Sequence, residues 1–175
     1  KKEYTKAIYE AIYGVYKAEY EEKKNAIINE HEKENKNKSS FFGGDIMLNS
    51  FHILKEEFKN SQFLMDKDYD FKSIKDTLQK ELDKGTLNYR VIFAFDSQLK
   101  ITKEEYEELI SMCKNHKVYL IAFDKVTATF RFKDVETLDF YRETLSHEEY
   151  LMVDKIHLTT SGNKALCKLL KKMMK

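Results

Sequence analysis

Arg90-Val-Ile-Phe-Ala-Phe95 and Val118-Tyr-Leu-Ile-Ala-Phe123 are the two stretches that decide the fold of this 175-residue chain. Each is a short apolar run rich in branched and aromatic residues, which is typical of a strand buried on both faces of a sheet. A helical pattern lies between them, with Thr102 as its N-cap and Glu105 at the capping-box position. Two buried strands joined by a helix indicate a parallel sheet.

The same alternation of strands and helices extends outward from these runs. The further elements that we predict are strands at 39–42 and 62–65 and helices at 46–58, 71–82, 134–145 and 161–173. The predicted fold is therefore α/β, with a mainly parallel sheet and helices on both faces. Ligands of such sheets bind at the carboxyl ends of the strands, so any chemistry is expected in the loops there.

Residues 126–132 leave two alternatives open. They read VTATFRF and alternate like a strand, but only Asp124 and Lys125 separate them from the preceding strand. Two residues can join antiparallel strands but not parallel ones. This segment is either an inserted hairpin or an extended loop.

Residues 1–38 read as a helical arm and linker, distinct from the α/β domain at 39–175. Two neighbouring stripes at helical spacing consist of Tyr4, Ile8, Ala11, Ile12 and Val15, and of Tyr9, Tyr13, Tyr16 and Tyr20. We predict a helix over Tyr4–Tyr20, with residues 19–38 as the connecting segment. Its aromatic face is expected to pack mainly against the chain's own domain; a dimer or partner surface is the alternative.

Composition argues against several classes of function. Lys plus Arg number 31 and Asp plus Glu number 30, so the net charge of +1 argues against a strongly basic nucleic-acid binder. No apolar run approaches the roughly 20 residues of a membrane span. Cys113 and Cys167 have neither zinc-site spacing nor the number for a disulfide framework, and no phosphate-binding glycine loop is present. We therefore expect no metal and no cofactor.

The sharpest motif is Val153-Asp-Lys-Ile-His-Leu-Thr-Thr-Ser-Gly162, in which two residues separate Asp154 from His157. It precedes a helix that Ser161 could cap. On a turn, this spacing lets the carboxylate accept from one imidazole nitrogen while the other faces outward as a general base. The alternative is an ordinary turn in which both side chains bond to backbone.

The sequence DKIHLTTSGNKAL in this motif resembles the last block of the SGNH hydrolase superfamily. More closely, it resembles the C-terminal SGNH domain of membrane acyltransferases that O-acetylate peptidoglycan. The resemblance covers residues 39–175 and implies a three-layer, flavodoxin-like fold in which Asp154 and His157 form the catalytic dyad. It also implies an extracytoplasmic domain at the cell surface, tethered by a membrane domain that would precede Lys1.

The other blocks depart from the pattern of the superfamily. SSFFGGDIML places Asp45 at the nucleophilic serine, and a shift by one residue places Ile46 there. FLMDKDYDF places Asp70 at a glycine of the oxyanion hole, and VIFAFDSQLKIT places Gln98 at an asparagine of that hole. Both carboxylates oppose serine-hydrolase chemistry. Asp45 cannot replace the serine alkoxide, and Asp70 would repel a developing oxyanion. Ser97 is the least implausible substitute nucleophile.

These departures lead to three hypotheses. The first is an SGNH-like domain of a membrane O-acyltransferase-type protein that is inactive as a serine esterase. Its partners would be a cell-surface glycan, an acyl donor or acceptor, and the parent membrane domain. The second is an active O-acetyltransferase or esterase of altered mechanism that uses Asp154 and His157. The third is an interaction module built on the tyrosine-rich helix. The alignment also predicts that Asp45 lies beside His157 and raises its pKa.

Overall fold

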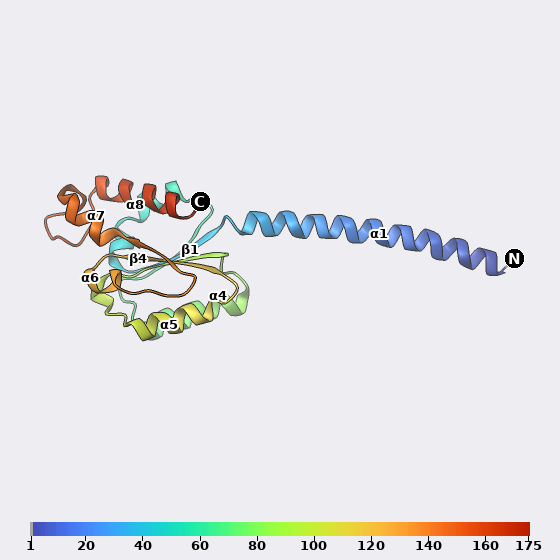
Figure 1. Cartoon of the computed structure of the whole chain (residues 1–175), viewed down its shortest axis with the longest axis horizontal. Coiled ribbons are helices and arrows are strands. Elements are labelled where there is room, and N and C mark those ends of the chain that lie inside the picture. The colour runs from blue at the N-terminus through green and yellow to red at the C-terminus, as the bar shows by residue number, and fades with distance from the viewer. Residues whose placement is uncertain (1) are drawn as a thin grey trace. The chain divides into compact units, whose positions relative to one another are not determined.

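The computed structural model describes residues 2–175, apart from the side chains at 2, 28–29 and 31–34. The chain divides into two compact units between Asn37 and Lys38, and each is described by itself. The first unit is the single helix α1 (Lys2–Asn35), and the second holds a five-stranded sheet with the remaining helices (Figure 1). Over the described residues, none of the helices combines the length and the apolar character needed to cross a bilayer.

The sheet consists of five parallel strands in the order β2-β1-β3-β4-β5. The strands are β1 (Ser39–Gly43), β2 (Gln62–Met65), β3 (Arg90–Ala94), β4 (Lys117–Ala122) and β5 (Glu136–Asp139). This is the flavodoxin-like order, which confirms the predicted fold class. The chain leaves β1 toward β2 on one side and later continues to β3 on the other. The carboxyl ends of β1 and β3 therefore form the switch point where such sheets bind ligands.

Alternate residues of the strands face two separate cores, so the domain has three layers (Figure 1). Phe41 and Ile92 lie in one core and Phe42 and Phe93 in the other. The first core is covered by α2 (Asp45–Asn49), α3 (Phe51–Glu57), α7 (Phe140–Ser146) and α8 (Thr160–Met173). The second is covered by α4 (Phe71–Lys84) and α5 (Lys103–Met112).

Each core contains one buried free cysteine, Cys167 in the first and Cys113 in the second. Burial raises the pKa of the Cys167 thiol to about 11 and that of the Cys113 thiol to about 12. Both thiols are therefore packed as apolar groups and are protonated at neutral pH.

The helices on the second face begin and end at residues that the sequence marks. Thr102 and Glu105 form the predicted capping box of α5. Asp70 and Ser73 form another at the start of α4, which ends at Gly85 in the left-handed conformation (φ 67°).

The segment between β4 and β5 does not contain the hairpin that the sequence allowed. Asp124 caps a short helix, α6 (Lys125–Ala128), and its carboxylate accepts from the Thr127 amide at 2.9 Å. The chain then continues as a loop in which Phe130 and Phe132 pack against Tyr106, with ring centroids 5.9 and 6.1 Å away. The alternating aromatic pattern thus reflects packing on α5 and not a strand.

Two of the predicted helices are wrong in part. The predicted helix at 134–145 begins only at Phe140, because residues 136–139 form the edge strand β5. This strand reads ETLD and is only partly buried, so it has no apolar run. The predicted helix at 46–58 is interrupted at Ser50, whose hydroxyl donates to the Ile46 carbonyl at 3.0 Å, and it forms two helices instead of one.

The arm is one continuous helix. The predicted helix over Tyr4–Tyr20 is confirmed, but residues 19–35 extend it and do not form a separate connecting segment. The rings of Tyr9 and Tyr13 stack with centroids 6.4 Å apart, and no other element of residues 2–37 covers the aromatic face. Packing of this face against the α/β domain stays a prediction.

A close backbone contact fixes the start of α8. Thr159, and not the predicted Ser161, caps the helix by accepting from the Gly162 amide at 3.1 Å. A Cβ atom built on Gly162 would lie 2.2 Å from the carbonyl oxygen of Tyr150. The helix can approach the preceding loop this closely only because residue 162 is a glycine.

We predict that Gly162→Ala lowers the free energy of unfolding by about 1–3 kcal/mol, because the added methyl group meets backbone that cannot rotate away. Urea denaturation followed by circular dichroism measures this change. Gly14→Ala in α1 is the matched control, since nothing lies within 4 Å of its added Cβ, and it should leave the stability of the domain unchanged. A Gly162→Ala variant as stable as the wild type would contradict the prediction.

Candidate active site

The first site residue, Asp45, is presented at the carboxyl end of β1 by a tight turn. A Cβ on Gly43 would lie 2.5 Å from the Cβ of Met47, and a Cβ on Gly44 would lie 2.8 Å from a carboxylate oxygen of Asp96. Both approaches are closer than a side chain permits. The two glycines therefore let the chain pass directly from β1 into α2, of which Asp45 is the first residue.

His157 comes from a loop that is held by local hydrogen bonds. Leu151 and Leu158 form an antiparallel bridge that closes the loop. Inside it, Oδ1 of Asp154 accepts from the backbone amides of Ile156 at 2.9 Å and His157 at 3.0 Å. Such a side-chain-to-backbone turn fixes the relative orientation of Asp154 and His157.

The imidazole of His157 lies between two carboxylates. Its Nδ1 is 2.5 Å from Oδ2 of Asp154, and its Nε2 is 2.6 Å from Oδ2 of Asp45. The predicted contact between Asp45 and His157 is therefore present. Ionised carboxylates only accept hydrogen bonds, and a neutral imidazole has a single N–H to donate. Both carboxylates therefore receive a hydrogen bond only when His157 is an imidazolium, which has two N–H groups. We call Asp45, His157 and Asp154 the charged triad.

Two members of the charged triad, His157 and Asp154, have shifted pKa values. The pKa of His157 is raised above its ordinary 6.5, chiefly by the hydrogen bond to Asp154 and next by the one to Asp45. The hydrogen bond from His157 is the main cause that lowers the pKa of Asp154 to about 2. An imidazolium has no free lone pair, so in this state His157 is a poor general base.

Asp96 is a buried carboxylate that sequence reasoning missed. It follows β3, is only 5% exposed and accepts a hydrogen bond from the Ile46 amide at 3.3 Å. Burial is the main cause that raises its pKa. The sequence signal that could have identified Asp96 is its position as a charged residue directly after the strongest apolar run. Negative charge developing beside the amide after Asp45 would meet this carboxylate.

The structure does not bring Gln98 or Asp70 into the charged triad. Gln98 is exposed in the short 3-10 turn η1 (Ser97–Leu99). Asp70 is exposed too, and its carboxylate accepts from the Ser73 amide at 2.8 Å, which lowers its pKa. Across residues 2–175, no hydrogen bond joins either side chain to Asp45 or His157. Their oxyanion-hole roles stay predictions.

A cavity of about 210 Å³ adjoins the charged triad. Ile46 and Ile156, the chain neighbours of Asp45 and His157, both line it. Most of its other walls are apolar, and they include Phe123, Tyr141, Leu145, Leu151 and Leu158. The described part of the chain holds no group of three side chains that could bind a metal ion. This volume suits a small group beside the triad, since pockets for whole ligands typically exceed about 300 Å³.

We predict that His157 titrates above pH 6.5 and that Asp154→Asn lowers its pKa more than Asp45→Asn does. The reason is that the bond to Asp154 is the larger cause of the upward shift. The stability that protonated His157 contributes is therefore full below pH 6.5 and is lost as the pH rises through the folded-state pKa. Titration of the imidazole signals by NMR measures the pKa in each variant.

Asp83→Asn is the control for this titration. Asp83 is an exposed carboxylate near the end of α4 that accepts a hydrogen bond from Gln79, so its loss should leave the His157 titration unchanged. If Asp45→Asn shifts the pKa of His157 no more than Asp83→Asn does, Asp45 does not contribute to that pKa and the prediction is wrong.

Comparison with known proteins supports the fold and goes no further. No family profile matches this sequence, and no curated protein is detectably similar to it in sequence. Among solved structures, the chain is similar to the C-terminal catalytic domain of peptidoglycan O-acetyltransferase A (OatA) from Streptococcus pneumoniae, solved with a methylsulfonyl adduct. The TM-score is 0.66 and the sequence identity 12%, over 77% of this chain and 90% of that one. The chain therefore has the SGNH-like fold of that domain, as its last sequence block implied.

Proposed function

We propose that this chain is an SGNH-like domain that binds a cell-surface glycan, with peptidoglycan as the first candidate, and lacks serine-hydrolase chemistry of its own. It would act within a membrane O-acyltransferase-type protein, at the extracytoplasmic surface. The contact between Asp45 and His157 carries the proposal, because the alignment puts Asp45 at the position of the nucleophilic serine. The fold likeness to a peptidoglycan O-acetyltransferase domain supports the choice of glycan.

The 2.6 Å contact between Asp45 and His157 supports the loss of serine-type catalysis. A serine nucleophile needs a neutral histidine that accepts its proton. Here both imidazole nitrogens face carboxylates, so His157 is held as the donor of two hydrogen bonds. Acylation of Asp45 itself would yield a mixed anhydride and would require no proton transfer to His157.

The position of Asp96 supports the same conclusion. Catalysis of acyl transfer relies on hydrogen-bond donors aimed at the developing oxyanion. The Ile46 amide is such a donor beside Asp45, but it already donates to the Asp96 carboxylate at 3.3 Å. An oxyanion at this amide would therefore have to displace a buried acidic group or be repelled by it.

The proposal assigns separate partners to the two units. The α/β domain would hold the glycan at the carboxyl edge of the sheet. The helix α1 would connect to the parent membrane domain, since its aromatic face is left uncovered within residues 2–37. An acyl donor or acceptor would then reach the domain from the rest of the assembly.

We predict that this chain hydrolyses p-nitrophenyl acetate no faster than the His157→Ala variant, because the site has neither a serine that His157 could deprotonate nor a free oxyanion site. Asp45→Ser alone should also stay at the background rate, since Asp96 still faces the Ile46 amide. The double variant Asp45→Ser/Asp96→Asn should exceed Asp45→Ser by at least about tenfold, in line with the effect of an oxyanion-hole donor. Release of p-nitrophenolate measures all four rates.

Asp45→Ser/Asp83→Asn is the matched control for the double variant, since it removes a carboxylate outside the site. Wild-type turnover above background that disappears in His157→Ala would contradict the proposal. That result would favour the competing function, an esterase or O-acetyltransferase of altered mechanism that uses Asp154 and His157.

We predict that this chain co-sediments with insoluble, purified peptidoglycan in a saturable way and does not co-sediment with cellulose. Leu145→Arg should weaken the binding, because this exposed residue (68%) lines the cavity beside the charged triad. Ile27→Arg is the matched control, since Ile27 is equally exposed (67%) and lies in α1. Absence of sedimentation with peptidoglycan would contradict glycan binding.

A further inference from the structure

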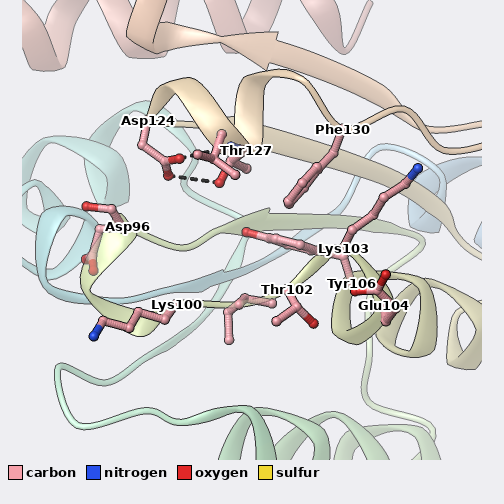
Figure 2. A pocket seen from close by; sticks show the side chains of 12 residues that line it. Asp96, Lys100, Thr102, Lys103, Glu104, Tyr106, Asp124, Thr127 and Phe130 are labelled. Atoms are coloured by element: carbon pink, nitrogen blue, oxygen red, sulfur yellow. Dashed lines mark hydrogen bonds between the residues drawn. The ribbon is translucent and has the colours of Figure 1, made fainter.

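A second and larger cavity, of about 490 Å³, has Asp96 in its lining. It is bounded by the segments that follow β3 and β4 and by the start of α5, and Figure 2 shows the side chains that line it. Asp96 and Asp124 lie at one end of this cavity and Phe130 at the other. Its volume falls within the range of pockets that hold small ligands.

The least explained group in this cavity is the hydroxyl of Tyr106. Tyr106 as a whole residue is 1% exposed, and no side-chain hydrogen bond is among the causes that shift its pKa. In Figure 2 the Tyr106 ring extends into the cavity, with its hydroxyl toward the end where Asp96 and Asp124 lie. Both carboxylates add to the burial that raises the pKa of Tyr106, which agrees with this placement. Among the described residues only Asn163 Oδ1 is both fully buried and unpaired, so the Tyr106 hydroxyl is reached from the cavity and can bond to a ligand group there.

The remaining lining defines the chemistry of the ligand. The Asp124 carboxylate is held in place by the Thr127 amide at 2.9 Å and the Thr127 hydroxyl at 2.8 Å, which leaves acceptor capacity on its oxygens. Together with Asp96 it offers acceptors, and Lys100 and Lys103 also line the cavity, so its charges are mixed. The half-buried ring of Phe130 and the side chain of Val126 provide apolar walls. Acceptors beside an aromatic face suit a neutral ring that carries several hydroxyl or amide donors.

The two cavities are neighbours at the carboxyl edge of the sheet, because they share part of their lining. Ser97 and Asp124 line both of them. A chain-like ligand can therefore lie with one unit beside the charged triad and another in the larger cavity. A single small ligand would have no need of both.

We propose that the larger cavity is a subsite for a further sugar unit of the glycan chain, recognised by the hydroxyl of Tyr106, the carboxylates of Asp96 and Asp124, and the ring of Phe130. This inference rests on the proposed glycan-binding function and deepens it. It gives the domain a preference for chains over isolated units.

The test is calorimetric titration of this chain with peptide-free peptidoglycan oligosaccharides of two and six sugar units. We expect the hexasaccharide to bind more tightly than the disaccharide. Tyr106→Phe removes only the hydroxyl and should raise the Kd for the hexasaccharide about 5- to 10-fold, as expected for one lost hydrogen bond. Tyr119→Phe is the matched control, because Tyr119 is also buried (5% exposed) but does not line the cavity.

A second variant keeps the test independent of folding. Val126 is 65% exposed at the cavity, and Val126→Arg should block it and weaken hexasaccharide binding. Val15→Arg, at a 62% exposed position of α1, should not. If both oligosaccharides bind but Tyr106→Phe and Val126→Arg behave like their controls, the subsite is wrong and the proposed function stands. If neither oligosaccharide binds to the wild type, the proposed function itself is wrong.

Discussion

The tight turn at Gly43 and Gly44 is the constraint on which the site depends. Strand β1 is buried along its whole length, and the chain must leave it between Met47 on one side and Asp96 on the other. Only backbone fits between them. The turn fixes the start of α2, and with it the place where Asp45 meets His157. The same close approach holds Asp96 against the Ile46 amide, so that one packing constraint positions two carboxylates.

The parts of the fold that depend on local pattern could be predicted from the sequence. The strands β3 and β4 are buried on both faces and read as apolar runs, and the caps of α5 and the end of α4 follow from short motifs. β5 could not be predicted in this way. It lies at the edge of the sheet, its residues are only partly buried, and its pairing with β4 is set by the path of the preceding loop. The aromatic pattern of that loop follows from its contact with Tyr106, which no local signal reveals.

The candidate site, too, could be predicted from the sequence only in part. The contact between Asp45 and His157 was predictable from the resemblance to the SGNH superfamily, whose alignment assigns both residues to one site. The orientations of Gln98 and Asp70 were not, since one is turned to solvent in η1 and the other is used to cap α4. Asp96 was missed because its burial arises from packing beneath the turn at Gly44, and charge near a strand end does not by itself indicate depth.

The two cysteines give the domain a pair of internal reporters. Cys113 and Cys167 lie in the cores on opposite faces of the sheet. With pKa values of about 12 and about 11, only a minute fraction of either thiol is ionised at neutral pH, so alkylating reagents can react only when a core opens. The rate of labelling at Cys113 therefore follows the opening of the layer formed by α4 and α5. The rate of labelling at Cys167 follows the opening of the layer formed by α3 and α8. Each face of the α/β domain can therefore be monitored without adding a probe.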